Sequence, residues 1–161
     1  MGEATRQLKF KAPLQKVWQV WTDVEKTPQW VEGVRESQIT SPIREGKGLA
    51  WKEKCLFGKQ IIQMDHEVKE WEPLKKTRVQ TGLPMGGTME SVVEFKNVEA
   101  WSPHPSSGGQ TLPPHETEVV LHLEWDLGMV GMIIGEEKLQ HMMEKSLDLT
   151  LQKWKAQAEG Q

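Results

Sequence analysis

The sequence of 161 residues contains no tyrosine and only one cysteine, Cys55. A single thiol excludes an internal disulfide. No apolar run approaches the roughly 20 residues that a membrane-spanning helix needs, and the first ten residues, MGEATRQLKF, lack the apolar segment of a secretory signal. These absences together predict a protein of the reducing cytoplasm with no stable membrane association.

Clustered positive charge is also absent. The 20 Lys and Arg residues are scattered and balanced by 23 Asp and Glu residues, which gives a formal net charge of −3. Proteins that bind nucleic acid through its phosphates carry a basic patch or stripe. We therefore expect no nucleic-acid partner.

Metal-ligand spacing is missing as well. The acid–His–acid run at residues 65–67 is consecutive, so its side chains cannot converge on one ion from a strand. Glu137, His141 and Glu144 share one side of a predicted helix, but this is the polar side and is interpreted as a solvated face. The glycines of LPMGG lack the context of a phosphate-binding loop. We therefore expect neither a metal nor a cofactor.

Tryptophan and methionine are abundant, with eight of each against three phenylalanines. Three of the tryptophans fall within APLQKVWQVWTDVEKTPQW, residues 12–30. Tryptophan is rarely hidden completely, and flexible thioethers adapt to irregular apolar spaces. The two counts predict either a large packed core or a cavity with an aromatic wall.

The apolar pattern predicts a strand around Leu8 and Phe10, a helix that begins at Pro13, and a second short helix capped by Asp23. Turn residues then separate six strand-like segments: GVRESQITS, GLAWKEKCLF, KQIIQMDHEVKEWEP, KTRVQTG, GTMESVVEFKNVEAW and ETEVVLHLEWD. Because no helix intervenes, the sheet should be antiparallel. The Pro/Gly/Ser-rich residues 102–116 predict a loop that joins two paired strands.

From Met129 onward the pattern predicts one long helix that runs nearly to the C-terminus. Seven residues share one side of it: Met132, Leu139, Met143, Ser146, Leu147, Thr150 and Trp154. This side is apolar but interrupted by two hydroxyl groups. A face that packs only on a dry core would more often be uniformly apolar, so the interruption favours a cavity beneath the helix.

The order of these elements, with these residues, resembles the START-like (SRPBCC) superfamily and, within it, the polyketide cyclase/dehydrase and lipid-transport group. Four segments carry the resemblance: APLQKVWQVWTDVEKTPQWVEGV, GKGLAWKEK, EVKEWEPLKKTRVQT and MEKSLDLTLQKWKAQAE. The resemblance implies an α+β helix-grip fold over residues 1–161 as one ligand-binding domain. In this fold a curved antiparallel sheet wraps around the long C-terminal helix. The two short helices would close one side of a cavity, with Trp18 and Trp21 supporting that closure.

Strand alternation assigns side chains to the inner face of the sheet. In GLAWKEKCLF the more apolar set is Leu49, Trp51, Glu53 and Cys55, which turns Glu53 inward. In IIQMDHEV it is Ile62, Met64, His66 and Val68, which turns His66 inward. The last two strands contribute Met89, Ser91, Val93 and Phe95, and then Thr117, Val119, Leu121, Leu123 and Trp125.

A mostly apolar cavity with a few polar groups has the usual composition of a small-molecule site. Twelve residues are predicted as ligand contacts: Trp51, Glu53, Met64, His66, Ser91, Val93, Thr117, Leu121, Leu139, Met143, Ser146 and Thr150. A carboxylate and an imidazole in such a cavity can act as acid and base. A register shift of one residue would turn both outward, so no catalytic residue is assigned.

Three functions stay open at this stage. The first is binding of a small hydrophobic molecule, such as a lipid, an isoprenoid or an aromatic polyketide. The second is a polyketide cyclase or dehydratase that uses the same cavity. The third is a protein-interaction module, such as a chaperone co-regulator. A roomy apolar cavity favours the first, a converging acid and base favour the second, and a cavity filled by large side chains favours the third. The sequence predicts neither the ligand nor the oligomeric state.

Overall fold

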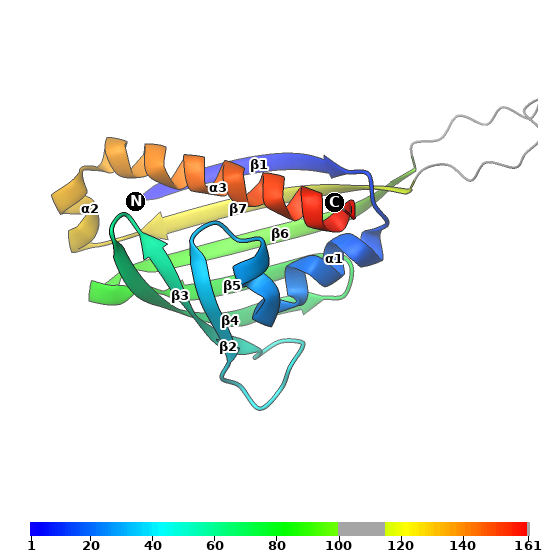
Figure 1. Cartoon of the computed structure of the whole chain (residues 1–161), viewed down its shortest axis with the longest axis horizontal. Coiled ribbons are helices and arrows are strands. Elements are labelled where there is room, and N and C mark those ends of the chain that lie inside the picture. Colours follow the sequence, from blue (N-terminus) through cyan, green and yellow to red (C-terminus); the bar gives the residue numbers. More distant parts are fainter. Residues whose placement is uncertain (100–114, 161) are drawn as a thin grey trace, which may run out of the picture.

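Seven strands form one antiparallel sheet in the order β1-β7-β6-β5-β4-β3-β2 (Figure 1). The computed structural model describes residues 1–99 and 115–160. The strands are β1 (Gly2–Phe10), β2 (Val34–Ile39), β3 (Ala50–Phe57), β4 (Gln60–Glu72), β5 (Lys76–Gly82), β6 (Thr88–Glu99) and β7 (His115–Asp126). The α+β helix-grip prediction is confirmed.

The helices are α1 (Leu14–Thr22), the 3₁₀ helices η1 (Val24–Gln29) and η2 (Pro84–Gly86), α2 (Met129–Ile134) and α3 (Glu136–Ala158). The long helix α3 lies across one face of the sheet, and α1 lies beside its C-terminal half (Figure 1). None of the helices in these parts of the chain is both long and apolar enough to cross a membrane.

The prediction of one uninterrupted helix from Met129 is wrong. The chain breaks at Gly135, whose φ of 93° lies in the left-handed region that favours glycine. Because α2 therefore ends before α3 begins, Met132 does not share the inner side of α3, and 85% of its surface is exposed. The helical spacing of the apolar residues continues across the glycine, so periodicity alone could not reveal the break.

Two irregularities in the strand pairing accompany the curvature of the sheet. The register shifts between Val34 and Glu36 on β2 and between Val68 and Glu70 on β4. Such bulges bend a strand and increase its twist. The last two strands pair regularly from Thr88↔Asp126 to Glu99↔His115, so the segment predicted to join two paired strands does join them. The predicted loop itself lies almost entirely outside the described residues.

An aromatic cluster fastens α3 to the rest of the fold. Its centre is Trp154, which has no exposed surface and whose indole N–H donates to the carbonyl oxygen of Val17 on α1 at 3.2 Å. Four other rings surround it at centroid distances of 4.8–6.0 Å: Trp21, Phe10, Trp30 and Phe95. Two of the three tryptophans of residues 12–30, Trp21 and Trp30, therefore help to hold the C-terminal half of α3.

We expect Trp154→Ala to lower the free energy of unfolding by about 3–5 kcal/mol, because it removes a fully buried ring and leaves a cavity. The measurement is a urea unfolding curve. The control is Met132→Ala at an exposed site, which should change stability by no more than about 0.5 kcal/mol. A shift for Trp154→Ala no larger than that of the control would contradict the central role of this ring.

Candidate functional site

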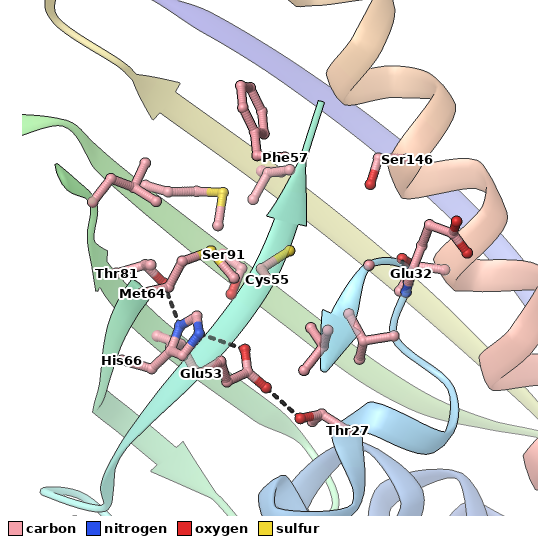
Figure 2. Close-up of a pocket in the computed structure, with 18 of the residues that line it drawn as sticks. Thr27, Glu32, Glu53, Cys55, Phe57, Met64, His66, Thr81, Ser91 and Ser146 are labelled. Carbon is pink, nitrogen blue, oxygen red and sulfur yellow. Dashed lines mark hydrogen bonds and ion pairs between the residues drawn. The ribbon is translucent and has the colours of Figure 1, made fainter. Parts of the chain in front are cut away.

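A cavity of about 540 Å³ lies between the inner face of the sheet and α3. Strands β3, β4 and β5 supply much of its wall, and η1 with the following loop closes one side. The rest of the wall comes mainly from α1, β2, β6, β7, η2, α2 and α3. Figure 2 shows Ser146 projecting from α3 toward this space, opposite the side chains of β3.

The structure places nine of the twelve predicted contacts on the cavity wall: Trp51, Glu53, Met64, His66, Ser91, Leu121, Met143, Ser146 and Thr150. Their role as ligand contacts stays a prediction. Ser146 lies at the rim of the cavity, where its side chain is exposed.

The other three predicted residues, Val93, Thr117 and Leu139, point inward but lie away from the cavity. Val93 has no exposed surface and belongs to the packed core. The hydroxyl of Thr117 donates to the carbonyl oxygen of Ala12 at 2.8 Å and so fixes the chain after β1. Leu139 is packed near the start of α3, where α2 contacts it. Alternation predicts the face of a strand but not the position of a cavity along it.

A chain of hydrogen bonds forms the polar part of the wall (Figure 2). His66 Nε2 lies 2.6 Å from Glu53 Oε1, and His66 Nδ1 lies 2.6 Å from the hydroxyl of Thr81. The Thr27 hydroxyl donates to Glu53 Oε2 and also lies 3.1 Å from the carbonyl oxygen of Val24. Both nitrogens of the imidazole and both oxygens of the carboxylate therefore have partners, as buried polar groups usually do.

The regular register of three strands brings this chain together. Trp51 on β3 pairs with His66 on β4, which pairs with Thr81 on β5. Glu53 is two residues beyond Trp51 and therefore points to the same side of the sheet. The indole of Trp51 stacks on the imidazole at 4.9 Å and holds the ring plane. Glu53 and His66 are both buried, at 5% and 8% exposure, so their predicted inward orientation is correct.

Sequence reasoning missed two members of the chain, Thr27 and Thr81. Alternation in KTRVQTG would have placed Thr81 inward together with Thr77 and Val79, and all three are buried. Thr27 lies in the 3₁₀ helix η1, where no apolar periodicity marks its orientation. Only the packing of η1 over β3 reveals that it reaches Glu53.

The loop that follows η1 joins the sheet to α3 at one side of the cavity. The backbone N–H of Leu56 donates to the carbonyl oxygen of Gly33 at 2.8 Å. Gly33 has a φ of +85°, and a Cβ there would come within 3.0 Å of Leu56 O, so glycine is required. Glu32 precedes this glycine in the chain. Its carboxylate forms an ion pair with Lys153, and its backbone N–H donates to Thr150 Oγ1 at 3.2 Å.

Apolar and sulfur-containing side chains make up most of the remaining wall. Five of the eight methionines lie on it: Met64, Met85, Met89, Met142 and Met143. Four of the eight tryptophans do as well: Trp21, Trp30, Trp51 and Trp71. The indole N–H of Trp21 on α1 donates to Thr77 Oγ1 on β5 at 2.9 Å. Trp18 packs instead on Trp71 and Phe95.

A separate polar group lies on the outer face of the sheet. Possible ligand atoms of Glu3, His122 and Glu124 lie within 4.8 Å of one another, and the Thr5 hydroxyl lies 2.7 Å from His122 Nδ1. These residues project from β1 and β7 away from the cavity, and both carboxylates are exposed. The group therefore plays no part in the candidate site.

The half-buried Cys55 also lies on the cavity wall. Burial, with a smaller contribution from the neighbouring Glu53 carboxylate, raises the pKa of the Cys55 thiol from 9.0 to about 11. The thiol is therefore protonated at neutral pH and acts as a small apolar group, since the thiolate is the reactive form.

We expect Cys55 in the folded protein to react with a disulfide reagent at pH 8 at least about tenfold more slowly than an ordinary thiol, because its thiolate fraction is much smaller. The measurement is the absorbance change on reaction with Ellman's reagent. Because the chain has a single cysteine, the whole signal comes from Cys55. The chain unfolded in urea is the control and should react at the ordinary rate. Equal rates in the folded and unfolded chains would contradict a protected thiol.

Solved structures with the same fold cover nearly the whole chain. An aromatase/cyclase, Zhui, from Streptomyces sp. R1128 is similar over 98% of this chain and 93% of its own, with a TM-score of 0.74 and 17% identity. A START superfamily protein from Mycobacterium smegmatis is similar over 98% and 97%, with a TM-score of 0.72 and 12% identity. A protein from Thermus thermophilus is similar over 98% and 97%, with a TM-score of 0.70 and 19% identity. At these identities the likeness concerns the fold alone.

Comparison by sequence gives a more specific result. No curated protein matches the chain. The family profile described as polyketide cyclase / dehydrase and lipid transport matches residues 1–159. The resemblance to START-like proteins is thereby confirmed, and the chain belongs to the polyketide cyclase / dehydrase and lipid transport family.

Proposed function

We propose that this chain, acting as one domain, binds a small hydrophobic molecule in the cavity between the sheet and α3. The candidates are a lipid, an isoprenoid or an aromatic polyketide. The observation that carries the proposal is an apolar space of about 540 Å³ that side chains leave unfilled. Ligand sites typically enclose about 300–1,000 Å³ and carry a few polar groups on an apolar wall.

The composition of the wall supports this proposal. Tryptophan rings give large rigid surfaces, and methionine side chains can repack around ligands of different shapes. The nine predicted contacts that lie on the wall are proposed to touch the ligand. A cavity of this size also supports ligand binding over a module that only contacts other proteins, because such a module has no need for an unfilled core.

A second candidate is a cyclase or dehydratase that uses the same cavity. One specific observation favours it, namely the contact of 2.6 Å between Glu53 and His66 on the wall of the ligand space. A carboxylate and an imidazole so placed can take a proton from a carbon beside a carbonyl group and return it to a departing hydroxyl. Family membership is compatible with either function.

For the binding function, we expect Ser146→Leu to weaken the affinity for a neutral apolar fluorophore, N-phenyl-1-naphthylamine, about tenfold, or ~1.4 kcal/mol. The added side chain at the rim would narrow the cavity. The measurement is a titration followed by probe fluorescence and by quenching of tryptophan emission. The control is Lys145→Leu, the adjacent exposed position on α3 that lies off the wall. Failure of the unmodified protein to bind this probe or any of a panel of lipids and polyphenols would refute the proposal.

For the cyclase, Glu53→Gln and His66→Gln are each expected to lose about a hundredfold or more in turnover, a much larger loss than their loss of ligand affinity. The assay follows cyclised aromatic product formed from a linear poly-β-ketone chain. Glu32→Gln, at the side of the cavity where the carboxylate is paired with Lys153, is the matched control. Full turnover in both the Glu53 and His66 variants would remove this pair from the mechanism.

A further inference from the structure

The described residues of the cavity wall offer no free positive charge to a ligand. Among the described residues that line the cavity there is no lysine and no arginine. The titratable side chains on the wall other than the protonated Cys55 are Glu32, Glu53 and His66. Two of these three are acids, and only the imidazole can carry a positive charge.

That imidazole is already engaged. His66 Nε2 contacts Glu53 Oε1, and Nδ1 contacts Thr81 Oγ1, each at 2.6 Å. Any positive charge on His66 is therefore balanced by the carboxylate beside it. Lys153 forms an ion pair with Glu32 and does not line the cavity.

An anionic ligand would consequently lose its hydration on entering this space and find no counter-charge. A buried charge without a partner is strongly unfavourable, whereas an uncharged hydroxyl is far less costly to bury and needs only a hydrogen-bond partner. The cavity therefore distinguishes ligands by the charge of their polar group as well as by their shape.

Uncharged hydrogen-bonding groups, in contrast, have partners available. A carboxylate offers about four acceptor positions, and Glu53 uses two of them within the protein. Ser91 adds a hydroxyl to the wall.

We propose that the ligand is an uncharged hydrophobe bearing a hydroxyl group, such as an alcohol, a phenol or an enol, and that the cavity rejects carboxylates and phosphates. The hydroxyl hydrogen would donate to Glu53, and the hydroxyl oxygen would accept a hydrogen bond from the wall. This inference rests on the proposed binding function and narrows its ligand class. It excludes free fatty acids and phospholipid headgroups from the interior.

The test compares ligands that differ only in charge. Decanol, decanoate and decyl phosphate form one set, and 2-naphthol and 2-naphthoate form another. Each displaces N-phenyl-1-naphthylamine from the unmodified protein at pH 8. We expect the neutral member of each set to bind at least about tenfold more tightly than the anion, a difference of ~1.4 kcal/mol. An anion that binds as tightly as its neutral counterpart overturns the inference and leaves the binding function standing, whereas no binding by the probe or any ligand overturns both.

A charge insertion tests the cause of this preference. Met143 lies half-buried on the wall in α3, and Met143→Lys would bring a cation to the cavity. We expect this variant to gain affinity for decanoate and lose affinity for decanol, so that their ratio falls at least about tenfold. The control is Lys145→Met, which removes a cation close by on α3 but off the wall, and it should leave the ratio unchanged. An unchanged ratio in a folded Met143→Lys protein would show that the missing cation is not the cause.

Discussion

The position of α3 is the constraint on which the cavity depends. The helix is fixed at its C-terminal half by the buried ring of Trp154 and near its start by Leu139. Along one edge, Arg6 on β1 forms ion pairs with Asp148 at 2.8 Å and Glu144 at 3.6 Å. The helix is thus held over the β1 side of the sheet. Between these attachments α3 forms one wall of the cavity, and β3, β4 and β5 supply much of the rest of it.

The polar pair inside this space is not explained by stability. Replacing a buried ion pair by apolar residues of similar volume is often neutral or stabilising. Glu53 and His66 nevertheless occupy the inner face of two adjacent strands, with a threonine partner for each. Packing alone therefore gives no reason for a polar pair at this position, whereas the hydroxyl-bearing ligand proposed above would give one.

Sequence reasoning succeeded where the backbone is regular. The inward orientation of Glu53 and His66 follows from alternation because β3 and β4 pair without a register shift over Ala50–Phe57. Sequence reasoning failed where the position of a side chain depends on tertiary packing. Val93 and Thr117 point inward as expected. Their positions along β6 and β7, however, place them in the packed core and not on the cavity wall. Thr27 reaches Glu53 only because η1 folds over β3.

The overall architecture was predictable for a different reason. The order of elements and four characteristic segments resemble a known family, and that resemblance supplies a topology that periodicity alone does not. Neither the apolar periodicity nor the family resemblance predicted the break at Gly135. A glycine inside an apolar pattern is compatible with a continuous helix, and only its left-handed backbone conformation ends α2 there.

The pairing of the first strand with the last has a consequence for the synthesis of this protein. Phe10 on β1 lies opposite Thr117 on β7, more than a hundred positions later. At a translation rate of about 5–20 residues per second, β1 leaves the ribosome roughly 5–20 s before its partner exists. Non-local pairing of this kind also slows folding once the chain is complete. The newly made N-terminal segment, with its cluster of tryptophans, must therefore stay unaggregated during that interval, and the alternating charged and polar residues of β1 help to keep it so.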